Sequence, residues 1–386
     1  MNAHVCPSRQ ELFMFSVGRT VGDNARQQLS RHVNSCQGCQ ATLAFLDDTS
    51  DAVVAALRQT VSTCGCSDST CEQLLGSDRP EFVLGQTALP EPEAGTQLED
   101  YRLVAKLSEG GMGAVFRAIH TRLGKTVAVK VLRAERSRDP VSLARFLREI
   151  QLVGTLEHPN LVRALDAREL KGRHILVMEF LEGIDLRHLL DRQGPLPIPE
   201  SCEAIRQACM GLEYASRRHG LVHRDVKPSN LMLTSEGCVK VLDLGLALAA
   251  DEVNMADFTR GQLIVGTIDY MAPEQWLDSE AVDSRADVYS LGCTLYHVLT
   301  GRPPYGEEGD SAAQTMWGHF NAPLPRLGDA RPDAPATLDG IIGRLLAKQP
   351  QDRFPTPGDV ATALLPLTKG QRLAQLVATA GQSDHR

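Results

Sequence analysis

The stretch that decides the fold of this chain is His223-Arg224-Asp225-Val226-Lys227-Pro228-Ser229-Asn230. It supplies a carboxylate at Asp225, a cation two residues later at Lys227 and an amide at Asn230. Transfer of a phosphoryl group needs these three parts: a carboxylate to orient the attacking hydroxyl, a cation to offset phosphate charge, and an amide oxygen to bind a metal ion. Eight residues of this kind could also form an ordinary polar surface loop, so the other segments have to decide.

Length and charge set the broad class of the protein. The 386 residues are enough for two or three domains of about 150 residues each. A formal net charge of −8 argues against a broadly basic nucleic-acid surface, so we expect nucleotides and proteins as partners and no nucleic acid. No stretch approaches the ~18 uninterrupted apolar residues of a membrane span, and the first residues lack a secretory apolar region. We expect a cytoplasmic protein whose ten Cys are thiols or metal ligands rather than disulfides.

Residues 1–60 are predicted to form a separate helical module. If a helix continues through this region, His32 and Cys36 lie one turn apart on one face, and the spacing of Cys36 and Cys39 lets two thiolates bind one ion. Tetrahedral zinc needs a fourth ligand, and Cys6 is the upstream candidate. The alternative is a short helical bundle in which these Cys are small buried apolar side chains.

The spacing of His32, Cys36 and Cys39, with Cys6 upstream, resembles the zinc-binding domain of anti-sigma factors. This resemblance covers roughly residues 4–48 and implies bound Zn²⁺ and a regulatory protein partner. A later group, Cys64, Cys66 and Cys71, has no neighbouring His and is better explained as linker thiols than as a second site.

Residues 61–98 are predicted to be a linker. The stretch 89–96 combines two Pro, a Gly and acidic residues, which favours an extended, solvated chain. A domain boundary is therefore expected near Leu98.

From Tyr101 the pattern changes to strands. A predicted strand at residues 103–107 leads into a Gly-rich turn, where Gly110 and Gly113 let backbone amides approach phosphates because no Cβ intervenes. The next predicted strand, residues 126–130, ends in the cation Lys130. Helical periodicity follows over residues 141–156, and Glu149 lies within it.

Two further strands flank the opening stretch. Residues 175–178 lead into Glu179-Phe180-Leu181, and a predicted helix over residues 199–219 precedes His223. After the stretch, an apolar strand at residues 239–242 delivers Asp243 to a Gly-containing turn, which suits a carboxylate that binds Mg²⁺ between phosphates.

In this order the segments resemble bacterial eukaryote-like Ser/Thr protein kinases over roughly residues 101–365, followed by a tail at 366–386. The resemblance implies an α+β, two-lobed kinase fold, ATP and Mg²⁺ as cofactors, protein substrates and autophosphorylation. It implies that Asp225 orients the acceptor hydroxyl and that Lys227 steadies the γ-phosphate. It also implies a pair between Lys130 and Glu149, for which the alternative is a surface Glu.

The resemblance further implies the ligand-binding residues. Mg²⁺ would be held by Asn230 and Asp243. The nucleotide would contact residues from both lobes, although the apolar ones could equally be plain core. These residues are Leu107, Gly110, Gly113, Val115, Ala128, Lys130, Met178, Glu179, Leu181 and Met232.

An activation segment is expected over residues 243–274. Thr259 is the predicted phosphosite, because Arg224 beside Asp225 would offer a cation to a phosphate and order the segment. Thr267 is a second candidate phosphosite and is expected to contact Asp225 and Lys227. Three residues depart from the family pattern: Ser108 replaces the first loop glycine, Leu244 the usual Phe, and Ile268 a frequent Pro.

Two supporting contacts and two alternatives complete the predictions. Asp287 is expected to brace the catalytic loop, and Arg353 to pair with Glu274. The tail from 366 to 386 fits either a short amphipathic helix or disorder. The alternative function is a catalytically weak kinase-fold scaffold that acts through the N-terminal module. The presence of Lys130, Asp225 and Asp243 argues against it.

Overall fold

The computed structural model describes residues 32, 36, 92–110, 113–133, 140–170, 173–243, 268–277, 282–306 and 311–382. Within these ranges the side chains of residues 140–142, 145, 148, 149, 152, 313, 381 and 382 are not described. All described residues except His32 and Cys36 belong to one unit, formed by residues 90–252 and 264–386. None of the helices in these ranges has the length and apolar character needed to cross a bilayer.

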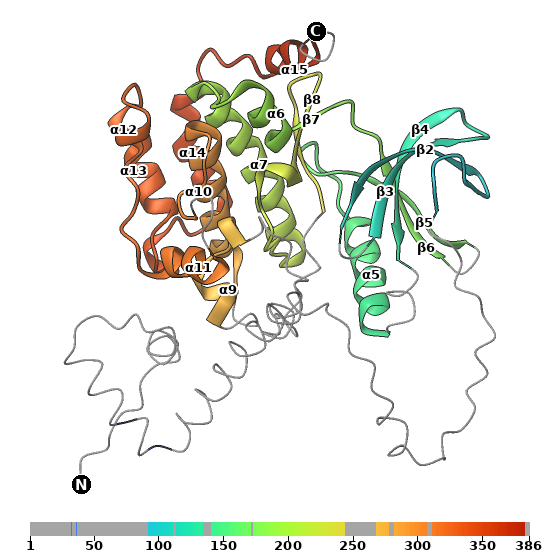
Figure 1. Ribbon diagram of the computed structural model, residues 1–386, viewed down its shortest axis with the longest axis horizontal. Coiled ribbons are helices and arrows are strands. Elements are labelled where there is room, and N and C mark those ends of the chain that lie inside the picture. Colours follow the sequence, from blue (N-terminus) through green and yellow to red (C-terminus); the bar gives the residue numbers. More distant parts are fainter. Residues whose placement is uncertain are drawn as a thin grey trace, which may run out of the picture. The chain divides into compact units, whose positions relative to one another are not determined.

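The first part of this unit is an antiparallel six-stranded sheet in the order β1-β2-β3-β4-β6-β5 (Figure 1). Its strands are β1 (Gln97–Leu98), β2 (Tyr101–Glu109), β3 (Gly113–His120), β4 (Lys125–Leu132), β5 (Ala164–Leu170) and β6 (Arg173–Glu179). One helix, α5 (Pro140–Val153), packs against the sheet.

Strand β4 explains how this lobe is packed. Val127, Val129 and Val131 belong to one buried cluster, whereas Ala128 and Leu132 belong to another. Successive side chains of a strand point to opposite faces, so β4 is covered on both sides. The second cluster also contains Phe146 of α5. The side chain of Lys130 therefore shares the face that α5 covers.

A second sheet has three short antiparallel strands in the order β7-β8-β9. They are β7 (Gly183–Asp185), β8 (Leu231–Thr234) and β9 (Val239–Val241). Strand β7 follows β6 after three residues and leads directly into helix α6 (Leu186–Gln193). Strand β8 follows Asn230 directly, and β9 ends two residues before Asp243. This small sheet thus carries Met232 and adjoins Leu181, Asn230 and Asp243.

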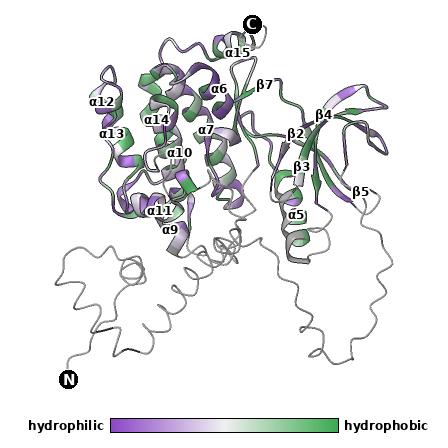
Figure 2. Cartoon of the chain, in the orientation of Figure 1, coloured by the Kyte–Doolittle hydropathy of each residue, from purple (hydrophilic) through white to green (hydrophobic). Residues whose placement is uncertain are grey.

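Helices make up the rest of the unit. The largest are α7 (Ile198–His219) and α10 (Ser284–Thr300), which pack together in the biggest apolar core (Figure 1). The others are α9 (Pro273–Leu277), α11 (Ala312–Asn321), α12 (Leu327–Ala330), α13 (Ala336–Leu345), α14 (Pro357–Leu364) and α15 (Leu373–Gln382). Short 3-10 turns are η1 (Pro228–Asn230), η3 (Ile268–Tyr270), η4 (Pro350–Asp352) and η5 (Leu365–Leu367). Figure 2 shows hydrophobic and hydrophilic residues together on most of these helices, whereas α10 is buried from Ala286 to Leu299.

The two-lobed α+β architecture predicted from the sequence is confirmed, and the ends of its predicted elements differ from the observed ones by at most three residues. One boundary differs for a physical reason. The predicted linker ran to residue 98, but Gln97 and Leu98 already pair with β2. Leu98 is only 2% exposed, because its side chain belongs to the apolar cluster under the sheet. The tail was left open between helix and disorder, and its residues 373–382 form helix α15.

The predicted pair between Arg353 and Glu274 is confirmed. Two guanidinium nitrogens of Arg353 lie 2.5 and 2.8 Å from the two carboxylate oxygens of Glu274. Arg353 also donates to the carbonyls of Ala347, Arg285 and Lys348. A buried guanidinium is tolerated only when its donors are satisfied in this way.

Two buried histidines make the helical lobe sensitive to acid. His297 shares a 2.6 Å hydrogen bond with the hydroxyl of Tyr270, and His319 shares one of 2.9 Å with that of Tyr289. Burial, with Arg187 nearby, lowers the pKa of His297 to about 4. Burial, with Lys348 nearby, lowers the pKa of His319 to about 3. Both imidazoles are therefore neutral in the folded protein at pH 5.

We predict that the free energy of unfolding falls between pH 7 and pH 5. Unfolded His takes up a proton below pH ~6.5, whereas folded His297 and His319 do not, so acid favours the unfolded chain. Each histidine accounts for about 2 kcal/mol over this interval. Urea unfolding at the two pH values measures the difference, and His319→Gln should roughly halve it. Equal unfolding free energies at pH 5 and pH 7 would contradict the prediction.

Candidate active site

Asp225 lies at the centre of a compact network in the loop before β8. One oxygen, Oδ2, lies 2.9 Å from Lys227 Nζ and accepts a 3.1 Å hydrogen bond from Asn230 Nδ2. The same Nδ2 donates to the Asp225 carbonyl at 2.8 Å. Among the described residues, no hydrogen bond reaches the other oxygen, Oδ1. The network thus fixes the carboxylate and leaves one oxygen for an external hydroxyl.

The predicted brace by Asp287 is confirmed. Its two carboxylate oxygens accept from the backbone N–H groups of His223 and Arg224, both at 2.8 Å. Arg224 has a φ of 65°, a left-handed conformation that a non-glycine residue adopts only when its surroundings impose it. Gln275 Nε2 supports the same turn by donating to the Arg224 carbonyl at 2.9 Å. The strained turn is therefore held from α10 and α9.

His223 connects this loop to the segment that carries Asp243, a role that the sequence analysis missed. Its ring nitrogen Nδ1 accepts the Asp225 N–H at 3.3 Å. The proton of a neutral ring must then be on Nε2, which donates to the Leu242 carbonyl at 2.9 Å. The only available signal was the place of His223 two residues before Asp225.

Lys130 and Asp243 meet across the two lobes. Lys130 Nζ lies 3.0 Å from Asp243 Oδ1. The ammonium of Lys130 is the largest cause of the lowered pKa of Asp243, so this carboxyl is ionised at neutral pH. Asp243 has a φ of 41°, again in the left-handed region. The predicted partner of Lys130, Glu149, belongs to α5, but its side chain is outside the described residues.

Asn230 and Asp243 offer oxygen ligands that fit Mg²⁺. The nitrogen of the Asn230 amide is bound to Asp225, which leaves its oxygen for a cation. The Asn230 backbone carbonyl accepts a hydrogen bond from Leu242 N at 2.9 Å. Since Leu242 directly precedes Asp243, this bond joins the segments that carry the two proposed ligands. An amide oxygen with a carboxylate oxygen matches the preference of Mg²⁺ for hard donors.

Four predicted nucleotide residues gather in one apolar cluster on the α5 side of the sheet. Ala128 and Met178 are buried in it, and Val115 and Leu181 pack against it. Leu242 joins the same cluster and was missed by the sequence analysis, although it directly precedes Asp243. The remaining two apolar residues lie elsewhere: Leu107 is 50% exposed, and Met232 is half-buried on β8.

Glu179, directly after Met178, is held by an ion pair that the sequence analysis did not predict. The carboxylate of Glu179 lies 2.8 Å from Lys240 Nζ of β9 and accepts the Arg163 N–H at 2.9 Å. Its backbone N–H donates to the Arg163 carbonyl at 3.0 Å. The connection between the lobes is thereby fastened to the strand that leads to Asp243.

Gly113 is fixed by strand packing. A Cβ on Gly113 would lie 2.0 Å from the Val131 carbonyl oxygen, whereas a Cβ on Gly110 would meet nothing within 4 Å. Gly110 N donates to the Gly113 carbonyl at 2.8 Å and closes the turn. The sequence analysis assigned both glycines to close phosphate approach. For Gly113 the structure adds a second requirement, the contact with β4.

Several predicted residues lie outside the part of the chain that the structure describes. They are Cys6, Cys39, Thr259 and Thr267. His32 is helical and half-buried, and its carbonyl accepts the Cys36 N–H at 3.0 Å. Across the described residues, no group of three or more His, Cys, Asp or Glu is arranged to hold a metal ion.

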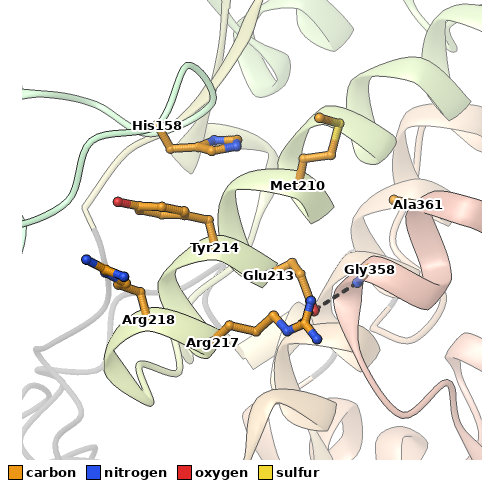
Figure 3. Close-up of a pocket in the computed structure, with 8 residues that line it drawn as sticks. All are labelled: His158, Met210, Glu213, Tyr214, Arg217, Arg218, Gly358 and Ala361. Atoms are coloured by element: carbon orange, nitrogen blue, oxygen red, sulfur yellow. Dashed lines mark hydrogen bonds and ion pairs between the residues drawn. The ribbon is translucent and has the colours of Figure 1, made fainter.

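Figure 3 shows a surface groove of about 620 Å³ elsewhere on the helical lobe. It is formed by α7, by His158 after α5 and by the start of α14, where Glu213 accepts the Gly358 N–H at 3.0 Å. His158 stacks on Tyr214 with 5.1 Å between ring centroids. None of the predicted site residues lines this groove, so it is separate from the candidate active site.

The family model described as "Protein kinase domain" matches residues 101–363. The chain belongs to the protein kinase family. The match begins with β2 and ends within α14, so it includes both lobes but not α15.

Curated relatives and solved structures agree with this assignment. The chain is 39% identical over 273 residues to serine/threonine-protein kinase PknH of Mycobacterium tuberculosis, covering 71% of this chain and 42% of that protein. It is 40% identical over 280 residues to serine/threonine-protein kinase PknB of Mycolicibacterium smegmatis, covering 70% of this chain and 43% of that protein. The crystal structure of the M. tuberculosis PknI kinase domain matches with a TM-score of 0.56 at 30% identity, covering 72% of this chain and 98% of that one. The chain spans less than half the length of the curated relatives.

We predict opposite outcomes for two glycine variants in the turn between β2 and β3. Gly113→Ala forces a Cβ against the Val131 carbonyl and should lower the free energy of unfolding by about 1 to 3 kcal/mol. Gly110→Ala, the matched control, has open space and should change it by less than about 0.5 kcal/mol. Chemical denaturation of both variants measures the contrast. Equal effects would show that contact with β4 does not constrain Gly113.

Proposed function

We propose that this protein is an ATP-dependent protein kinase that transfers the γ-phosphate to Ser or Thr hydroxyls of proteins. The carrying observation is the network at Asp225, in which Lys227 and Asn230 fix Oδ2 and no hydrogen bond from the described residues reaches Oδ1. This arrangement suits a carboxylate that orients one hydroxyl.

The proposed chemistry assigns each polar residue a step. Asp225 Oδ1 accepts a hydrogen bond from the acceptor hydroxyl and takes its proton late in the transfer. Lys227, already beside Asp225, steadies the γ-phosphate. Lys130 binds the α- and β-phosphates, and Glu149 is proposed as its further partner. Positioning and charge stabilisation supply most of the rate in such transfers.

Asn230 and Asp243 are proposed to hold Mg²⁺ through the amide oxygen and the carboxylate. Mg²⁺ would neutralise charge on the β- and γ-phosphates. The ionised state of Asp243 at neutral pH, maintained by Lys130, supports this role.

The nucleotide base is proposed to lie among the apolar residues of both lobes. The backbone of Glu179 and Leu181 would hydrogen-bond the adenine, with Met178 behind it. The remaining proposed nucleotide contacts are Leu107, Gly110, Gly113, Val115, Ala128 and Met232. The cluster of Val115, Ala128, Met178 and Leu181 supports part of this assignment.

The position of Lys227 and the names of the relatives support Ser or Thr as the acceptor, and the environment of Arg224 supports a phosphosite. Lys227 two residues after Asp225 is typical of Ser/Thr kinases, and the relatives above are named as such. Thr267 is proposed to contact Asp225 and Lys227, and Thr259 to be phosphorylated. Burial lowers the pKa of Arg224, so an anion such as phosphothreonine beside it would be favourable.

We predict that Asp225→Asn lowers phosphate transfer by about 10² to 10⁴-fold, because the amide cannot accept the hydroxyl proton. Binding of a nonhydrolysable ATP analogue should stay within about twofold, since Lys130 and Asp243 are intact. Radiolabelled autophosphorylation of the full chain measures transfer, and mass spectrometry of the wild type tests Thr259 and Thr267 as sites. Asp333→Asn, an exposed carboxylate paired with Arg331, is the matched control.

The same assay separates the kinase from the rival, a catalytically weak scaffold. A scaffold would show equally low transfer in the wild type and in Asp225→Asn. That result would reject the proposed function, whereas retained analogue binding alone would not rescue it.

We further propose that residues 1–60 form a zinc-binding module that engages a regulatory protein, in a protein that acts in the cytoplasm. The hydrogen bond from Cys36 N to the His32 carbonyl supports the placement of these two ligands one helical turn apart. Cys6 and Cys39 would complete a tetrahedral set.

Zinc content of the full-length protein tests this module. We predict about one zinc ion per chain in the wild type, and a loss of most of it in Cys36→Ser and in Cys39→Ser, because each removes one thiolate ligand. Cys64→Ser, outside the proposed ligand set, should leave it unchanged. Metal analysis after purification without chelators gives the stoichiometry, and a folded, zinc-free wild type would exclude the site.

A further inference from the structure

Helix α15 lies beyond the end of the family match and is nevertheless firmly packed. The match stops at residue 363, ten residues before α15 begins. Leu373 and Ala380, near its two ends, are 2% and 1% exposed. Leu376 and Val377 pack against the core of the helical lobe. The helix is therefore part of this domain although the family pattern does not include it.

Polar contacts hold α15 at both ends. Glu200, in the first turn of α7, accepts the Arg372 N–H at 3.0 Å. Arg192 donates to the Ala380 carbonyl at 3.2 Å, which is one of the terminal carbonyls that a helix leaves without an internal partner. These contacts give the short helix a fixed position on α6 and α7.

A third polar contact lies in the middle of the helix. Gln193, the last residue of α6, donates from Nε2 to the Leu376 carbonyl at 3.0 Å and to Thr379 Oγ1 at 3.2 Å. Helix α6 continues directly from β7, so the contact joins α15 to the helix that follows this strand. The end of α6 is thereby attached to α15.

The helix also covers the turn between β8 and β9. Gly237 in this turn has a φ of 82°, and a Cβ there would lie 3.0 Å from Ala374 N. In Figure 1, α15 lies beside α6 and the β7–β8 region, in agreement with its contacts to α6, α7 and β8. Strand β8 begins directly after Asn230, and β9 ends two residues before Asp243.

We propose that α15 is a positioning element that sets the affinity for the nucleotide. Three short strands make a marginal sheet by themselves, and this sheet carries or adjoins Leu181, Met232, Asn230 and Asp243. Backing by α15 fixes the sheet and the end of α6 relative to the proposed nucleotide site. The inference rests on the proposed kinase function, and it assigns residues 373–382 a role in ATP binding but none in the chemical step.

The test uses two ways of removing the helix from its place. Ala380→Glu introduces a carboxylate at a 1% exposed position and should displace α15, whereas Ala378→Glu on the exposed side of the same helix is the matched control. A chain that ends at residue 368 removes the helix but keeps α14 and η5. Urea unfolding identifies conditions under which all variants are folded.

The expected result is a split between affinity and turnover. In Ala380→Glu and in the shortened chain, the KM for ATP and the Kd of a nonhydrolysable analogue should rise about tenfold, with kcat within about twofold. A synthetic peptide of residues 366–386 should restore the affinity of the shortened chain in a saturable manner. Ala378→Glu should match the wild type.

Unchanged nucleotide affinity in both displaced variants would overturn the inference and leave the kinase function intact. A fall in kcat at constant affinity would overturn it as well. Absence of ATP binding and transfer in the wild type would instead reject the proposed function itself.

Discussion

The arrangement of the candidate active site depends on one buried carboxylate. Asp287 is 2% exposed and accepts two successive backbone N–H groups, those of His223 and Arg224. Burial raises its pKa, and the two backbone donors oppose that shift by stabilising the ionised form. Because Asp287 belongs to α10, whose residues contribute to the largest apolar core, the loop before Asp225 takes its position from a buried helix of the helical lobe. The left-handed turn at Arg224 persists for the same reason.

Hydrogen bonds carry this position from the loop to the proposed metal ligands. His223 bonds the Leu242 carbonyl, the Leu242 N–H bonds the Asn230 carbonyl, and the Asn230 amide bonds Asp225. The first two links join the catalytic loop to the segment that follows β9, and the third lies within the loop. Because the bonds are linked, they hold the Asp225 carboxylate, the Asn230 amide and the His223 ring in one arrangement, and a displacement of one segment disturbs the others.

The nucleotide side is positioned by other contacts. Lys240 of β9 holds Glu179 at the connection between the lobes, and α15 covers the turn at Gly237. Asp287 fixes the catalytic loop, whereas these contacts hold β9 and the β8–β9 turn that follow it. The separation gives a physical basis for affinity and turnover to respond to different substitutions.

The sequence by itself determined the contents of the catalytic loop, because Asp225, Lys227 and Asn230 are so close in the chain that local backbone geometry brings them together. Through the family pattern it also predicted the pairs of Asp287 with the loop and of Arg353 with Glu274. Only the tertiary structure decided the proton position on His223, the partner of Glu179 and the clash that excludes a side chain at Gly113. It also decided the state of the tail. A ten-residue helix is marginal in water, so α15 exists because Glu200, Gln193 and an apolar surface from distant parts of the chain hold it.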